Sequence, residues 1–154
     1  RPEATPELRD PIYQDFLSQK SATEKGLAEA EKKMDEYSEA VKKAAPQTGQ
    51  VKQNLKKYYE MQRRVITLSQ QSRYWNIRIE ERLVASRLEY RQAFAKGIPW
   101  PNEKEFETYR AEKKLRAARL QWDQKERVKE LKMGTRSVAG GGEGSATPTP
   151  AAHE

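Results

Sequence analysis

The longest stretch without a helix-breaking residue constrains this chain most. Residues 50–96 contain neither glycine nor proline and are flanked by Gly49 and Gly97. Since those two residue types interrupt helices most often, the run predicts a single helix of about 70 Å, at 1.5 Å per residue. A helix that long cannot be covered entirely by the rest of a 154-residue chain. Another helix of this chain, or a partner molecule, must pack against it.

Apolar and small residues recur through this run with a helical period and predict one packing face. They are Val51, Leu55, Tyr58, Val65, Leu68, Ser72, Trp75, Ile79, Leu83, Ser86 and Tyr90.

The N-terminal part predicts an arm followed by a helix. Residues 1–10 hold two prolines and no clear period, so we expect an extended arm. Asp10 and Pro11 then form a helix start, because aspartate caps the first turn and proline suits the first helical position. We expect this helix over 11–45, with a restart at the capping-box sequence SATE, residues 21–24.

A heptad pattern runs through the second half of that helix, with alternating steps of three and four. Its positions are Leu27, Ala30, Met34, Tyr37, Val41 and Ala44. The seam predicts coiled-coil packing, and it leaves a coiled-coil adaptor or a homodimer as one interpretation of the chain. Pro46 ends the pattern, and residues 46–49 are expected to form a loop.

The sequence GIPWPN, residues 97–102, predicts a corner between two helices. Gly97 suits the left-handed residue that closes a helix, and the prolines cannot continue one. Asn102 is the expected cap of the next helix. Trp100 lies between the prolines, where it either plugs the corner or inserts into a partner.

A third, highly charged helix is expected up to residue 133, so that residues 50–133 form a hairpin-like region. Residues 134–154 are rich in glycine, threonine and proline and are expected to form a low-complexity tail outside any core. The predicted fold class is all-α, with long extended helices and flexible terminal arms.

Composition argues against an enzyme. The chain has no cysteine and one histidine, which excludes disulfides, thiolate zinc sites and a cysteine nucleophile. We find no phosphate-binding loop, catalytic constellation or metal-binding motif, so we expect no cofactor, no metal and no small-molecule substrate. No stretch approaches the roughly 18 apolar residues of a membrane-spanning helix.

The positive charge of the chain is concentrated in its middle. The net charge is +7, and residues 50–97 alone carry 11 lysines and arginines against 4 acidic residues, a surplus of 7. Residues 1–49 carry 8 basic against 10 acidic residues, a net of -2. A basic stripe along one helix indicates nucleic acid or an acidic protein as partner.

Arginines dominate this stripe, and their planar guanidinium groups suit phosphate oxygens. We predict RNA contacts for Arg63, Arg64, Arg73, Arg78, Arg82, Arg87 and Arg91. We predict partner docking for the aromatic residues Tyr74, Trp75, Trp100 and Trp122. Acidic protein subunits remain the alternative partner of the arginines.

One local pattern resembles a known family. YWNIRIEER, from residue 74, is followed by GIPWPNEKEF and then by QKER, which begins at residue 124. This is similar to the mitochondrial version of the two-helix hairpin protein near the ribosomal exit tunnel. The usual lead-in before Tyr74 is absent, and the second helix is longer here. The whole chain, with long charged helices and a basic surplus, resembles accessory proteins of mitochondrial ribosomes.

The resemblance implies a non-catalytic structural subunit that binds ribosomal RNA and neighbouring proteins in the mitochondrial matrix. Arg1 in place of methionine then fits a removed presequence, or equally the boundary of an excised piece. An accessory or peripheral-stalk subunit of a respiratory chain or ATP synthase complex is the alternative, in which the helices brace protein.

Overall fold

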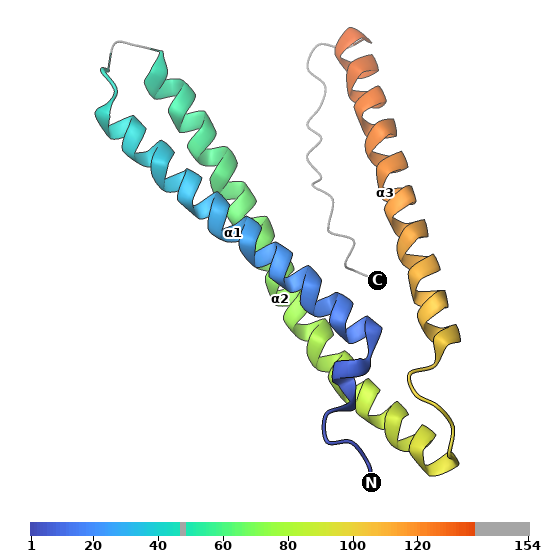
Figure 1. Cartoon of the computed structure of the whole chain (residues 1–154). Helices are drawn as coiled ribbons and strands as arrows, with labels where there is room; N and C mark the ends of the chain where they lie inside the picture. The colour runs from blue at the N-terminus through green and yellow to red at the C-terminus, as the bar shows by residue number, and fades with distance from the viewer. Residues whose placement is uncertain (47–48, 138–154) are drawn as a thin grey trace. The chain divides into compact units, whose positions relative to one another are not determined.

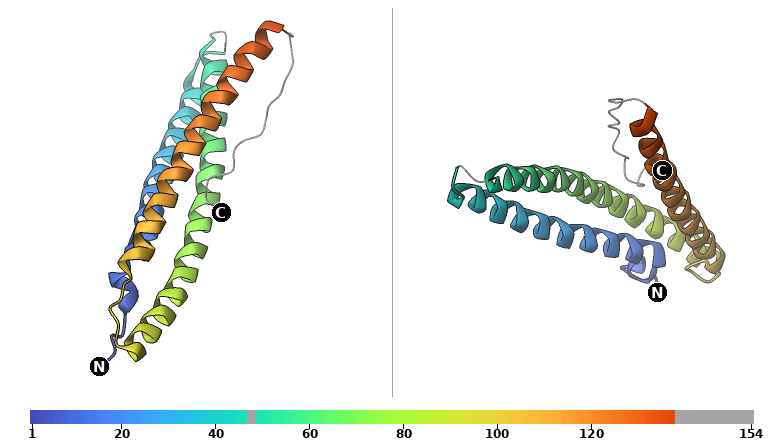
Figure 2. Two further views of the ribbon diagram at one scale, coloured as in Figure 1. Left: turned by 90° about the vertical axis from the view of Figure 1, so that its right-hand side faces the viewer. Right: turned by 90° about the horizontal axis from the view of Figure 1, so that it is seen from above.

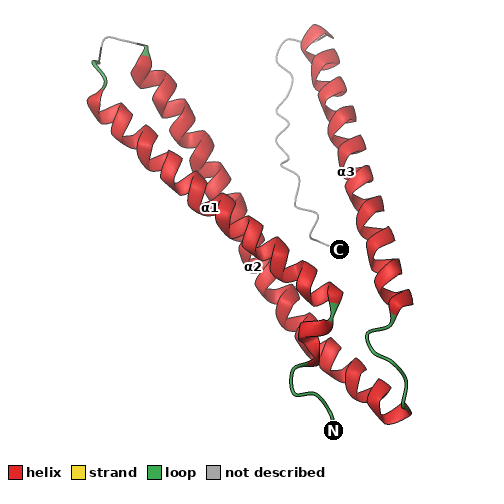
Figure 3. Ribbon diagram, viewed as in Figure 1, coloured by secondary structure: helices red, strands yellow, loops and turns green. Residues whose placement is uncertain are grey.

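A computed structural model of the chain describes residues 1–46 and 49–137. In these residues the backbone forms helices joined by turns and loops, and no strand (Figure 3). The elements are η1 (Pro6–Arg9), α1 (Pro11–Lys43), α2 (Gln50–Lys96) and α3 (Glu103–Ser137). The predicted all-α class with long helices is therefore confirmed. The chain divides into two units, Arg1–Pro101 and Asn102–Glu154, which are described separately.

Helix α1 begins as predicted but does not restart. The Asp10 carboxylate accepts a hydrogen bond from the Ile12 backbone N–H at 2.9 Å, which is the expected cap. At the predicted restart, the Thr23 hydroxyl instead donates to the carbonyl of Gln19, one turn earlier, at 2.9 Å. The SATE prediction was therefore wrong, because an Ser or Thr inside a continuous helix can satisfy its hydroxyl on the preceding turn.

Helices α1 and α2 lie side by side and run in opposite directions (Figures 1 and 2). The core of this hairpin consists of side chains from the two facing stripes. Phe16 and Ala30 of α1 are 4% and 2% exposed, and Leu68, Ile79 and Ala93 of α2 are also buried. Burial of these apolar faces against each other provides the main stabilisation of the first unit.

The heptad seam of α1 is covered inside the chain. Each of its six positions is buried or half-buried, in contrast to the charged residues between them. Near the loop end, the Lys57 ammonium of α2 lies 5.7 Å from the centre of the Tyr37 ring of α1. The packing that this seam predicts is therefore met by α2. Leu55 departs from the predicted α2 stripe, because it lies exposed on another face.

The N-terminal arm is more structured than predicted. It contains the short helix η1, and the side chains of Pro6, Glu7 and Asp10 are buried. The Glu3 backbone N–H donates a hydrogen bond to the Tyr90 hydroxyl at 2.7 Å, which ties the arm to α2. The predicted extended arm was wrong, because the prediction rested only on the lack of a local periodic pattern and did not include contacts with α2.

The corner after α2 forms as predicted. Gly97 adopts the left-handed conformation, with φ 69° and ψ 26°, and closes the helix. Trp100 packs edge-on against Tyr90, with ring centres 5.8 Å apart. The Arg9 guanidinium lies 5.7 Å from the centre of the Trp100 ring and donates to the Trp100 carbonyl at 2.9 Å. Of the two interpretations of Trp100, this packing fits the plug.

Helix α3 begins at the predicted cap and ends later than predicted. The Asn102 side-chain oxygen accepts from the Lys104 backbone N–H at 2.9 Å. The helix continues through Gly134 to Ser137, because one glycine in a helix costs only about 1 kcal/mol. Residues 138–154 of the predicted tail lie outside the described residues. The packed hairpin is that of α1 and α2, and the predicted one over 50–133 stays a prediction.

Replacement of Gly26 by alanine is expected to stabilise the hairpin. A Cβ atom there would lie 3.6 Å from the Leu68 side chain, an ordinary contact, and alanine favours the helix by about 0.5–1 kcal/mol. Thermal unfolding followed by circular dichroism measures the gain. The exposed control Ala28→Gly should lose a similar amount, and Leu68→Ala about 2 kcal/mol or more. A loss of stability in Gly26→Ala would mean that α1 and α2 are packed too closely there for a methyl group.

Candidate functional site

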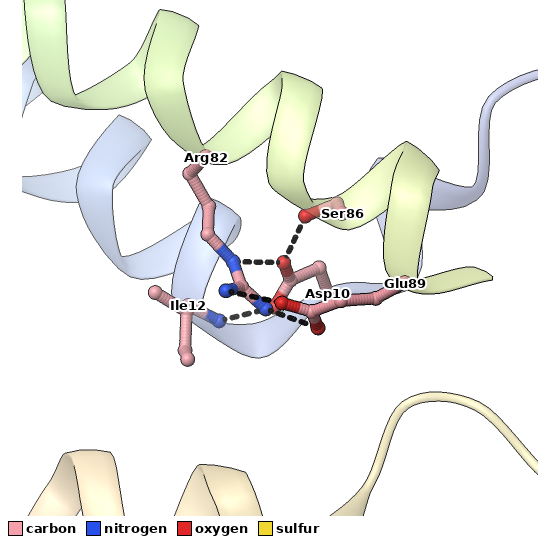
Figure 4. Close-up of polar contacts among 5 residues, drawn as sticks. All are labelled: Asp10, Ile12, Arg82, Ser86 and Glu89. Carbon is pink, nitrogen blue, oxygen red and sulfur yellow. Dashed lines mark hydrogen bonds and ion pairs between the residues drawn. The ribbon is translucent and has the colours of Figure 1, made fainter. Parts of the chain in front are cut away.

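Arg82 lies at the centre of a buried polar cluster between the arm and α2. Its guanidinium forms an ion pair with Asp10, which is 1% exposed, and contacts Glu89 at 3.3 Å. Figure 4 shows Asp10, at the start of α1, facing Arg82 and Ser86 of α2. The Ser86 hydroxyl donates to the same carboxylate oxygen. Arg82 is only 13% exposed, and its guanidinium is directed at these groups of the first unit.

Arg87 forms a second ion pair with the arm. Its guanidinium donates two hydrogen bonds to the Glu7 carboxylate, at 2.9 and 3.1 Å. These bonds lower the pKa of Glu7 below its ordinary value of 4.5, although burial acts in the opposite direction. We call Glu7, Asp10, Arg82, Ser86 and Arg87 the arm clasp. It gives the charges of Arg82 and Arg87 a role within the chain.

Arg78 also makes contacts within its own unit. Its guanidinium donates to Glu81 on the next turn at 3.1 Å. It lies 5.2 Å from the centre of the Phe16 ring of α1. A cation held over an aromatic face is stabilised by the ring quadrupole. Arg78 therefore contributes to the α1–α2 interface.

The other predicted arginines face solvent. Arg63, Arg64, Arg73 and Arg91 are all exposed on α2. In the part of the chain that the structure describes, none of the four forms an ion pair. The seven predicted arginines thus fall into two groups, and these four remain available to bind an outside partner.

A basic surface lies at the loop end of the α1–α2 hairpin. Between residues 42 and 64 the sequence has 7 lysines and arginines and one acidic residue, Glu60. The basic residues are Lys42, Lys43, Lys52, Lys56, Lys57, Arg63 and Arg64, and all are exposed. We call these seven residues the basic hairpin end. Lys42 contacts Glu39 at 3.3 Å at 69% exposure, a weak surface pair.

The predicted docking aromatics also differ in their surroundings. Trp75 is half-buried, with its ring centre 5.6 Å from Phe16 and 5.1 Å from Tyr74. Trp75 and Tyr74 thus belong to an aromatic cluster at the α1–α2 interface. Trp122 on α3 is 62% exposed, which is unusual for a residue that carries so large an apolar surface. Among the four, Trp122 is the one presented to solvent.

Two further properties concern chemistry. Among the described residues, no group of three or more histidine, cysteine or acidic side chains is placed to hold a metal ion. Within the same residues, no helix is long and apolar enough to cross a membrane.

Comparison with known proteins adds no relative: no family model, curated protein or solved structure matches the chain.

Sequence reasoning missed the acidic half of the arm clasp. Glu7 and Asp10 stand 80 and 72 positions from Arg87 and Arg82 along the chain, so no local pattern joins them. The acidic surplus of residues 1–49 against the basic surplus of residues 50–97 was the available signal. It indicated that the N-terminal part could neutralise some of these arginines.

In the Glu7→Gln variant, the free energy of unfolding is expected to depend less on pH under acidic conditions. Because the folded pKa of Glu7 lies below 4.5, the ion pair stabilises the fold fully above that pH, and the stabilisation is lost as the pH falls through the folded pKa. The variant should be less stable by about 1–3 kcal/mol at neutral pH and should lack this part of the acid loss. Urea unfolding at several pH values tests it. Parallel curves for both proteins would contradict this role of Glu7.

Arg82→Ala is expected to destabilise the first unit by about 3–5 kcal/mol, because Asp10 would stay buried without its ion-pair partner. The matched control is Arg64→Ala, also on α2 but exposed, which should stay within about 0.5 kcal/mol of the parent. Chemical unfolding followed by circular dichroism compares them. Equal effects would mean that Arg82 does not hold the arm.

Proposed function

We propose that this chain is a non-catalytic structural subunit of a large ribonucleoprotein, a mitochondrial ribosome, and that it contacts RNA through the basic hairpin end. The α1–α2 hairpin supplies a rigid support, and exposed arginine and lysine side chains supply the contacts. Such contacts recognise backbone phosphates and RNA shape, and they do not require base-specific pairing.

The observation that supports this proposal is the charge of the hairpin end. Seven basic side chains and one acidic residue share residues 42–64. Lys52, Lys56, Arg63 and Arg64 make no ion pair within the described residues. RNA phosphates would neutralise these positive charges and so relieve the repulsion between them. The counterions displaced from the RNA would add to the affinity.

The mitochondrial ribosome, and with it the matrix location, rests on the resemblance of the segment from Tyr74 onward and on the composition of the chain. This proposed location is the reason to follow the chain in organelle lysate.

A second candidate is an accessory or peripheral-stalk subunit of a respiratory or ATP synthase complex. The exposed apolar side chains of α3 favour it, because Leu115, Trp122 and Val128 are between 50% and 62% exposed. Side chains of this kind are buried by protein neighbours in stable complexes. In this candidate the basic residues would face acidic protein surfaces.

Gradient sedimentation of organelle lysate, with and without ribonuclease, separates the two candidates. Comigration of the chain with ribosomal particles, lost after ribonuclease, would support the ribonucleoprotein. Migration with a detergent-extracted complex that ribonuclease does not change would reject it and favour the second candidate.

Neutralising the basic hairpin end is expected to weaken RNA binding. The variant replaces Lys52, Lys56, Arg63 and Arg64 by glutamine. We expect at least about tenfold weaker binding to a structured RNA at low salt, and a salt slope reduced by up to about 3. Fluorescence anisotropy at several salt concentrations measures both.

The matched control removes the same charge from α3. It replaces Lys114, Arg116, Arg119 and Lys125 by glutamine, all exposed. Equal losses in the two variants would mean that RNA senses only net charge, and the hairpin end would not be a site.

A further inference from the structure

A second apolar stripe runs along α2 on the side away from α1. Its members are large side chains that are 36% to 67% exposed. They are Leu55, Tyr59, Ile66, Ile77, Val84 and Leu88, which we call the outer stripe. At 100° per residue they fall within an arc of about 60°, roughly opposite the buried positions Leu68, Ile79, Ser86 and Ala93.

The outer stripe is straight. Leu55, Ile66, Ile77 and Leu88 follow one another at intervals of 11 residues. Because 11 residues make just over three helical turns, these side chains form a row that runs nearly parallel to the helix axis over about 50 Å. A line of that kind fits another long helix along its whole length.

The outer stripe is also symmetric along the chain. Its members are placed in pairs at equal distances on either side of the midpoint between Gln71 and Ser72. The pairs are Leu55 with Leu88, Tyr59 with Val84, and Ile66 with Ile77. An antiparallel second copy of α2, centred on that midpoint, would therefore set every apolar residue of the stripe against an apolar residue.

The charges beside the stripe favour the antiparallel arrangement. In it, Arg63 would lie beside Glu81 of the second copy, on the same side of the interface and one residue apart along the axis. A parallel pair would instead place Glu81 beside Glu80 of the second copy, and like charges in such pairs are destabilising. Two costs remain. Arg73 lies on the stripe near the midpoint, so two Arg73 side chains would come close together, and Lys52 would lie level with Arg91 of the second copy at each end of the stripe.

From this register we infer that two copies of the chain associate through the outer stripes of α2, antiparallel and with a two-fold axis between Gln71 and Ser72. The interface is isologous, since the same surface is used by both copies. The inference does not depend on RNA binding, because it rests on the apolar residues of the outer stripe. Arg63 is the one residue that belongs to the basic hairpin end and also lies beside this interface.

Sedimentation velocity of the full chain over a range of concentrations tests the association. The parent should form a dimer. Ile66→Glu and Ile77→Glu should each weaken it by at least about 100-fold, because each charge enters the interface twice. The control Leu115→Glu, at an equally exposed position of α3, should leave the dimer unchanged. Circular dichroism confirms that the exposed substitutions preserve the helices.

Arg73→Gln gives the opposite expectation. Removing two like charges from the centre should tighten the dimer several-fold, whereas a surface on which Arg73 meets an acidic partner would be weakened.

Cysteine crosslinking tests the register, since the parent has no cysteine. Chains with Ile66→Cys, mixed with chains with Ile77→Cys, should form a disulfide under mild oxidation. Either variant alone should not, because its two cysteines would be about 16 Å apart along the axis, beyond the reach of a disulfide.

A parent that stays monomeric at every concentration would overturn the inference. So would a dimer that keeps its affinity in Ile66→Glu and Ile77→Glu. Crosslinking of one variant with itself would overturn the antiparallel register. If the parent stays monomeric and the stripe variants instead lose incorporation into a larger particle, the stripe binds a different protein.

Discussion

The contacts of the Asp10 carboxylate organise the first unit. One of its oxygens accepts the N–H of Ile12 and caps α1, while the other pairs with Arg82 and accepts from Ser86. The same side chain thus starts one helix and fixes where that start lies along the next. Since side chains on a packed helix face recur at set intervals, fixing one end sets the register of the remaining α1–α2 contacts. A carboxylate that is 1% exposed is stable there only because these donors replace water.

The two ends of the hairpin therefore differ in chemistry. At the arm clasp, charges are paired, shielded and part of the fold. At the basic hairpin end, charges of one sign face solvent and add little to stability. This separation lets an outside partner bind the second end without competing for the interactions that hold the first.

Local signals predicted the helices well and long-range pairing poorly. Asp10, Gly97 and Asn102 mark helix boundaries through their own backbone chemistry, so they can be read from neighbouring residues. The sequence could not show that Arg82 and Arg87 are used internally, because their partners lie in a proline-containing arm far away along the chain. The predicted helix restart at residues 21–24 and the predicted helix end at Gly134 each rested on a single sequence feature. Both were wrong, because a continuous helix tolerates such a feature.

The sequence predicted arginines of α2 as the candidate site, and the structure shows which of these arginines already make contacts within the first unit. Arginine-rich composition pointed to α2 as a whole. The contacts of Arg78, Arg82 and Arg87 give these three a role within the first unit and leave the exposed arginines as the candidates. Exposure and pairing depend on which face of α2 meets α1, and the apolar stripe of α2 and the heptad of α1 were the sequence features that bore on this.

Because of the arm clasp, the surface charge of α2 depends on the presence of residues 1–10. A protease that removed residues 1–10 would take away Glu7 and Asp10 together, and with them the cap of α1. The guanidinium groups of Arg82 and Arg87 would then face water without their arm carboxylates. Trimming of the N-terminus would thus loosen the hairpin and, in the same event, remove two carboxylates that balance the arginines in the far half of α2.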